Sequence, residues 1–240
     1  MSKIILKFLL LINTVFVSLI NINCNSCITE TGEVNLQKFT FEEFSAVELN
    51  IDCKVYLHQA NENYLSIQTN DSLFQFIETT NKRGRFKIEA DNCIKENSFL
   101  EVHIYSKVFD EISVKGATEV FTAQGLKGEN LDLNIEGSGK VELQLDFKKI
   151  DTEITASGDV YLSGSVDTHE IFINDSGNLT AFSLLSKKTN AKIKHSGNCK
   201  IYVSNELIAQ VNGSGDLQYK GTPKNVETEI TDSGRAKQVP

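Results

Sequence analysis

The chain of 240 residues lacks tryptophan and has only two prolines, Pro223 and Pro240. Apolar residues make up 40% of it, so the chain can bury a core and disorder is not expected. Val, Ile, Leu, Thr and Phe recur in short runs that Gly, Asn, Asp and Ser bound. This composition indicates β-strands joined by turns.

The sequence also lacks an apolar run long enough to span a membrane comfortably. The run from Phe8 to Ile20 would rise about 20 Å as a helix, whereas a bilayer core is about 30 Å thick. Lys3 and Lys7 precede it, which is the pattern of a signal peptide over residues 1–23, followed by a leader over residues 24–39. We expect export to the cell envelope or outer surface, and a spanning anchor is the weaker alternative.

Cys24 is a candidate for lipidation, because it follows the apolar run directly and resembles the lipid-modified cysteine of bacterial lipoproteins. Ile22 and Asn23 stand where such proteins usually have small residues. The alternative is plain cleavage nearby, which leaves Cys24 and Cys27 in a flexible leader. Contact with a membrane is expected only through a lipid anchor.

Paired cysteine motifs are missing as well. The chain has one Cys-x-x-Cys spacing and no second, so a zinc site is not expected. Nor do its turns have the glycine and aspartate period of calcium-binding nine-residue coils. We expect no metal and no cofactor. A disulfide between Cys53 and Cys93 is one alternative in an oxidising compartment. Free or buried thiols are the favoured alternative.

The chain has fewer basic than acidic residues, 24 against 32. The formal net charge is −8, and removal of Lys3 and Lys7 with a signal peptide would make it more negative. An acidic surface argues against nucleic acid as a partner. It does not choose among sugars, proteins and cations, so the expected partner is an unidentified surface ligand, either a glycan or a protein.

What the sequence does contain is a repeat marked by six Ser-Gly pairs. Their glycines are spaced 18 to 20 residues apart, at Gly139, Gly158, Gly177, Gly197, Gly215 and Gly234. Four residues before each glycine stands a β-branched residue: Ile135, Ile154, Ile173, Ile193, Val211 and Ile230. Two residues after it stands another mostly apolar column: Val141, Val160, Leu179, Cys199, Leu217 and Ala236. Apolar side chains at a period of two indicate strands with one buried face.

Each unit is predicted to be a strand, a Ser-Gly turn, a second strand and a short link such as residues 147–149 or 186–188. Glycine suits the turn because it adopts positive φ without a steric penalty. One unit cannot bury its apolar face alone, whereas stacked units place the isoleucine column in register. We predict an all-β fold, a right-handed parallel β-helix or β-solenoid with coils of about 19 residues; a β-sandwich is the alternative.

Fainter copies of the repeat lie upstream, with Thr118 and Cys53 in the glycine position. Residues 58–108 break the period and are expected to supply excursions or a cap that covers a strand edge. The resulting prediction is one domain over residues 40–236, irregular or capping over 40–113 and regular over 114–236.

The leader, the segments Phe41–Phe44 and Val47–Leu57, and the tandem Ser-Gly-Asp/Asn-Val units together resemble the putative auto-transporter adhesin, head GIN domain family of Bacteroidetes-type bacteria. The resemblance covers residues 40–236, although Cys53 stands where such sequences more often have glycine or a small residue. It implies a right-handed β-helix-like fold and a cell-envelope location.

Catalytic residues are not evident. Asp159 and Asp216 share the column after the turn glycine but lie three coils apart, about 14 Å, too far for a catalytic pair. Ser138 and Ser214 read as turn serines, because a nucleophile elbow needs a helix. The four histidines, His58, His103, His169 and His195, fall at unrelated column positions and are expected to face solvent.

The candidate contact residues are three aromatic side chains that should point outward: Tyr161, Phe172 and Tyr202. Exposed rings on a flat stack suit contact with sugar or protein, and packing within the solenoid is the alternative. The sequence therefore favours a non-enzymatic envelope protein, an adhesin or surface-interaction scaffold. The alternatives are a polysaccharide-active glycosidase or lyase and a purely structural envelope component.

Overall fold

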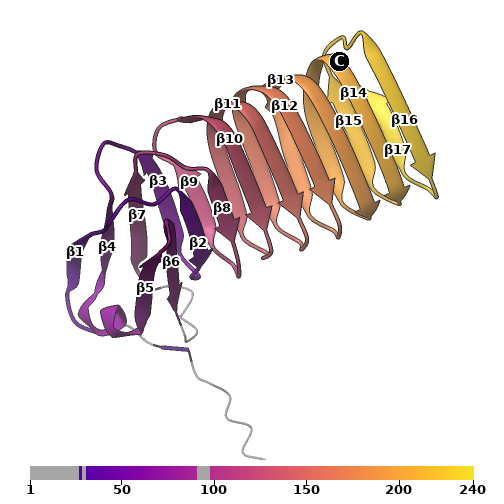
Figure 1. Ribbon diagram of the computed structural model, residues 1–240. Coiled ribbons are helices and arrows are strands. Elements are labelled where there is room, and N and C mark those ends of the chain that lie inside the picture. The colour runs from indigo at the N-terminus through magenta and orange to yellow at the C-terminus, as the bar shows by residue number, and fades with distance from the viewer. Residues whose placement is uncertain (1–26, 29–30, 91–97) are drawn as a thin grey trace, which may run out of the picture.

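The computed structural model describes residues 27–28, 31–90 and 98–240. The predicted signal peptide, Cys24 and Cys93 lie outside the described residues. In the rest the chain forms a stack of β-coils with an irregular N-terminal part (Figure 1). The predicted β-solenoid is confirmed, and the β-sandwich alternative is wrong, because successive coils pair in parallel along their length. No helix among the described residues is long and apolar enough to cross a membrane.

The N-terminal part stacks its coils out of sequence order. β2 lies between β6 and β8, and β3 between β7 and β9, with parallel pairing throughout. β4 adds antiparallel pairs with β1 and β7, and β5 pairs antiparallel with β6. β1 lies mostly within the predicted leader. The bounds are β1 Val34–Thr40, β2 Ala46–Asn50, β3 Lys54–Gln59, β4 Tyr64–Asn70, the 3-10 helix η1 Asp71–Phe76, β5 Ile77–Lys82, β6 Arg85–Ala90, β7 Leu100–Ser106, β8 Glu111–Val114 and β9 Glu119–Thr122.

The C-terminal part consists of regular coils that follow the sequence. Their long strands run continuously past the positions where a link was predicted, so that expectation is wrong. Two successive outward residues, such as Lys148 and Lys149, bend β11 without interrupting its pairing with β12. The bounds are β10 Leu126–Ile135, β11 Lys140–Ile154, β12 Asp159–Ile173, β13 Asn178–His195, β14 Asn198–Gly213, β15 Asp216–Lys220, β16 Asn225–Thr231 and β17 Arg235–Gln238.

The predicted columns form the core of these coils. Ile135, Ile154, Ile173, Ile193 and Val211 are fully buried, and so are Val141, Val160, Leu179, Cys199 and Leu217. Each buried side chain of this size contributes about 1.5–3 kcal/mol. The column ends at Ile230, which is 43% exposed because no described strand stacks beyond it.

The glycines of the Ser-Gly corners are required for a different reason from the one expected. Gly139 and Gly215 do not have positive φ. A Cβ on Gly139 would lie 1.9 Å from the carbonyl oxygen of Thr118, and one on Gly215 would lie 2.0 Å from that of Gly197. The corner therefore needs glycine because successive coils approach too closely there for a side chain.

Among the cysteines, the structure describes Cys27, Cys53 and Cys199. Cys53 and Cys199 carry free thiols, so the Cys53–Cys93 disulfide is wrong. Cys199 sits in the apolar column, where burial raises the pKa of its thiol to about 12. Cys27 is disulfide-bonded.

Candidate functional site

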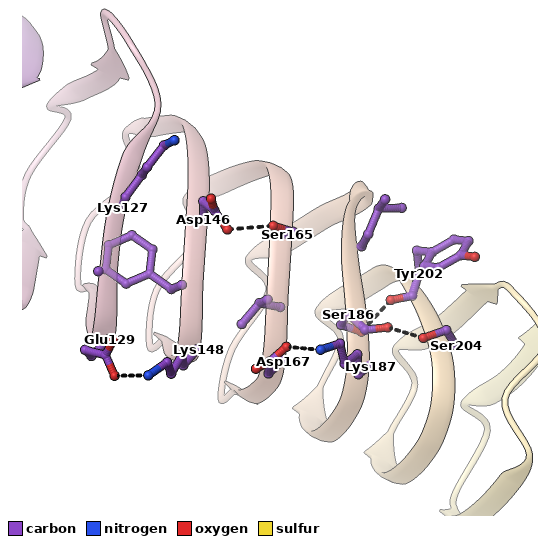
Figure 2. Close-up of a pocket in the computed structure, with 14 residues that line it drawn as sticks. Lys127, Glu129, Asp146, Lys148, Ser165, Asp167, Ser186, Lys187, Tyr202 and Ser204 are labelled. Atoms are coloured by element: carbon purple, nitrogen blue, oxygen red, sulfur yellow. Dashed lines mark hydrogen bonds and ion pairs between the residues drawn. The ribbon is translucent and has the colours of Figure 1, made fainter.

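A groove of about 770 Å³ crosses the bends of successive coils from β10 to β14. Figure 2 shows its side chains arranged in three columns, one inward column between two outward ones. We call it the bend groove. It lies between the outward residues that flank one inward residue on each coil, as Asp146 and Lys148 flank Phe147.

The floor of the bend groove is formed by the inward column. Its register partners are Gly128, Phe147, Val166 and Ser186. A Cβ on Gly128 would lie 2.6 Å from the ring of Phe147, so glycine lets this ring lie flat against the first coil. The floor is thus apolar at one end and ends in a serine hydroxyl.

One rim carries charges of alternating sign. Lys148 pairs with Glu129 at 2.6 Å, and Lys187 pairs with Asp167 at 2.6 Å (Figure 2). The hydrogen bond to Glu129 raises the pKa of Lys148. All four side chains are more than half exposed, and such surface pairs add little to stability. Their charges remain accessible to a ligand.

The opposite rim is polar at one end and apolar at the other. Ser165 donates a hydrogen bond to Asp146 at 2.8 Å. Leu185 and Tyr202 follow in the same column. Leu185 is 54% exposed, because the register of β13 against its neighbours shifts just before this residue and reverses the alternation. An irregularity of the repeat therefore places an apolar side chain on the surface.

At and after the bends the regular coils bury four polar residues: Thr152, His169, Ser186 and Thr189. Thr152 and the Nε2 atom of His169 lie 2.9 Å apart, and the hydroxyls of Ser186 and Thr189 lie 2.7 Å apart. Burial lowers the pKa of His169 to about 3, so its ring is neutral at ordinary pH. The expectation that His169 faces solvent is wrong.

The three predicted contact residues do not converge. Tyr202 lines the bend groove. Tyr161, 39% exposed, lines a smaller hollow over the stacked side chains of Asp159, Asn178 and Asn198. Phe172 lies after the bend, in a third hollow. Of these three residues, the bend groove brings only Tyr202 together with other candidate groups.

The column after the turn glycine, which holds Asp159 and Asp216, forms a hydrogen-bonded ladder. Asn178 donates to Asp159 at 2.9 Å, and Asn198 donates to Asn178 at 3.0 Å. The backbone N–H of Asp216 donates to Asn198 at 3.1 Å. These side chains satisfy one another, as scaffold residues do.

A carboxylate column that sequence reasoning missed lines the third hollow, of about 830 Å³. Asp132, Asp151 and Glu170 are register partners on successive coils, hence about 4.8 Å apart. Burial and the neighbouring Asp151 raise the pKa of Asp132. Lys149 pairs with Asp151 at 2.7 Å. No cluster of described residues could hold a metal ion. The 19-residue spacing of these acids was the available signal.

A ring stack in the N-terminal part was also missed. His58 and His103 stand at different register positions, opposite Tyr105 and Tyr56, but their Nε2 and Nδ1 atoms lie 2.9 Å apart. Six rings follow one another with centroids 3.9–5.5 Å apart: Phe121, Tyr56, His103, His58, Tyr105 and Tyr64. Lys140 and Lys38 lie over the two end rings. The ring faces are covered by one another, so this stack is structural.

Comparison with known proteins supplies a family. The family described as putative auto-transporter adhesin, head GIN domain, matches residues 43–223. No curated protein matches the chain.

Solved structures of similar shape come from Bacteroides and Parabacteroides. A putative adhesin of Bacteroides fragilis is 24% identical, with a TM-score of 0.83, over 88% of this chain and 100% of that one. A putative lipid binding protein of Parabacteroides distasonis is 21% identical, with a TM-score of 0.73, over 90% of this chain and 100% of that one. At these identities the likeness bears on the fold alone.

Proposed function

The chain belongs to the putative auto-transporter adhesin, head GIN domain family, and we propose that it is a non-enzymatic adhesin of the cell envelope that binds an extended glycan in the bend groove. The observation that carries the proposal is the combination of a largely apolar floor, one charged rim and one rim that changes from polar to apolar, over successive coils. An extended glycan has the same pattern, with apolar ring faces flanked by hydroxyls.

The spacing of the groove supports a linear ligand. Equivalent side chains recur about every 4.8 Å along the stack, a length similar to that of one sugar in an extended chain. Tyr202 and Leu185 offer apolar surface at one end, and the two ion pairs offer donors and acceptors along one rim. Binding energy would then be shared among several weak contacts on a rigid surface.

Export supports the same function. The basic start and the apolar run of residues 1–23 are the pattern of a signal peptide, and an adhesin must reach the surface to act. We propose that the thiol of Cys24 carries the lipid that holds the protein to the membrane. Metabolic labelling with a fatty acid tests this, since a Cys24→Ser chain should lose the label.

The binding test is a glycan array probed with the protein and with Tyr202→Ala and Leu185→Ser variants. Each change should weaken binding about 10-fold, which corresponds to about 1.4 kcal/mol. Tyr161→Ala and Phe172→Ala test the other two candidate contacts. If they abolish binding while Tyr202→Ala does not, the site lies in another hollow. Retention by lipid vesicles in place of any glycan would contradict the glycan proposal.

A second function has one observation in its favour. Asp132, with its raised pKa, stands beside Asp151 in the third hollow, and adjacent carboxylates about 5–5.5 Å apart are the pair of a retaining glycosidase. The ion pair of Asp151 with Lys149 favours a structural role instead. Release of reducing ends from a polysaccharide panel, lost in Asp132→Asn, would establish the enzyme. Absence of both binding and hydrolysis would leave a structural envelope component.

A further inference from the structure

The C-terminal end of the coil stack is an open strand edge. β16 pairs only with β14, and β17 only with β15, among the described strands (Figure 1). The outer backbone groups of both strands therefore have no ladder partner in the described part of the chain. Exposed edges of this kind are templates for pairing with another chain.

The open end also exposes side chains that belong to the core. Val226 and Ile230 are 46% and 43% exposed, although their register partners Leu207 and Val211 are fully buried. On β17, Ala236 is half-buried over Leu217 in the same way. One more pair of strands over this end would bury all three apolar side chains.

The outward side chains of the two edge strands carry opposite charges. β16 presents Glu227 and Glu229, and β17 presents Arg235 and Lys237. None of these four has an ion pair among the described residues, although Glu229 accepts a hydrogen bond from Gln210. The acidic strand and the basic strand run in opposite directions, because the chain reverses at the Ser233-Gly234 corner.

We propose that this end binds a second copy of the chain, with β16 of one copy pairing antiparallel with β17 of the other. A two-fold axis parallel to the strands brings each β16 over the partner's β17, and closes the assembly at two copies. In one register Glu229 lies opposite the partner's Arg235 and Glu227 opposite the partner's Lys237. The same register places Thr228 opposite the partner's Ala236, which keeps inward side chains facing inward.

Charge excludes the other two-fold arrangement. If β16 paired with the partner's β16, Glu227 and Glu229 would face like carboxylates, and Arg235 and Lys237 would face like cations on the other strand. Like charges directly opposite each other on paired strands are destabilising. The dimer therefore follows from the placement of acids on one edge strand and bases on the other.

The test is a charge swap followed by sedimentation velocity of the full-length chain. Glu227→Lys with Glu229→Lys makes both edges basic, and Arg235→Glu with Lys237→Glu makes both acidic. Each double variant should weaken dimerisation by about 100-fold or more, because close like charges at an interface cost several kcal/mol. Glu153→Lys, an exposed outward change four coils away, is the matched control and should leave the dimer intact.

Two further measurements test the geometry of the dimer. The basic and acidic double variants, mixed in equal amounts, should form heterodimers, and the chain with all four changes should dimerise with itself. If the changes had merely misfolded the chain, neither the heterodimer nor the dimer of the chain with all four changes would form. A wild-type chain that stays monomeric, assembles beyond two copies, or is indifferent to the swaps would overturn the proposal.

Discussion

The N-terminal part and the regular coils solve the same stacking problem with different side chains. In the N-terminal part the ring of Phe86 packs with those of Phe41 and Phe44, at centroid distances of 5.0 and 5.1 Å, within a core that is otherwise mainly aliphatic. In the regular coils the core consists mainly of Ile, Val and Leu columns that repeat on each coil. Aliphatic columns suit coils of constant width, whereas large rings fill the uneven spaces left by antiparallel excursions and stacking out of sequence order.

The difference also explains where function can reside. A regular coil reproduces its outward side chains in straight columns, so a groove such as the bend groove extends over several coils. In the N-terminal part the outward rings of His58, Tyr105 and Tyr64 stack on one another. The regular coils therefore carry an extended groove, whereas the irregular N-terminal strands pack their outward rings against one another.

The largest expected effect is in the aromatic core. Phe86→Ala should lower the free energy of unfolding by about 3–5 kcal/mol, because it removes a fully buried ring and leaves a cavity. Urea denaturation followed by circular dichroism measures it. Leu36→Ala, on the exposed strand β1, is the control and should change stability by less than about 1 kcal/mol. Equal effects at the two sites would mean that the N-terminal part has no core of its own.

In the regular coils the cost of a core substitution should depend on the position of the residue along the stack. Ile173→Ala should cost about 2–5 kcal/mol of unfolding free energy, since Ile173 is fully buried. Ile230→Ala, the same column at the open end, should cost less than about 1 kcal/mol in the monomer. The same denaturation measurement compares them. If Ile230→Ala lowers stability strongly only at high protein concentration, a second copy of the chain covers the C-terminal end of the stack under that condition.

The buried polar residues of the coils should make their stability depend on pH. The pKa of His169 is about 3 in the folded chain and about 6.5 when unfolded. The unfolded state binds the extra proton between these values, so stability falls as the pH drops below 6.5. The loss at pH 5 is about 2 kcal/mol. His169→Asn should remove this part of the slope, whereas His195→Asn, at an exposed site, should leave it unchanged.

Much of the fold could be predicted because the repeat is written in the sequence. The Ser-Gly corners and the Ile column gave coil length and inward positions, and Thr118 and Cys53 were placed correctly in the corner column. The Ser-Gly spacing could not reveal that β6 and β7 stack outside β2 and β3, because that contact joins segments with no common marker.

The candidate site was predictable only at Tyr202. Leu185 is exposed because of a register shift in β13, and simple alternation along the strand gives no sign of it. His169 occupies an inward column beside Ile150, so the spacing placed it in the core, but a lone histidine was read as exposed. The carboxylates of the third hollow follow the 19-residue spacing, but they lie outside the corner column that the Ser-Gly pairs mark.

The smallest expected effect concerns the ring stack, which distinguishes the two parts most directly. Tyr105→Leu removes the contacts with His58 and Tyr64, at centroid distances of 4.1 and 3.9 Å. Ring pairs contribute about 0.5–1.5 kcal/mol each beyond their buried area, so the unfolding free energy should fall by about 1–2 kcal/mol.

Tyr219→Leu is the matched control for that change. Tyr219 is also half-buried on a strand, but it contacts no other ring among the described residues, and its loss should cost less. Urea denaturation of both variants measures the difference. If the two substitutions have the same effect, the stack contributes only ordinary burial, and the N-terminal part is held together by its buried core.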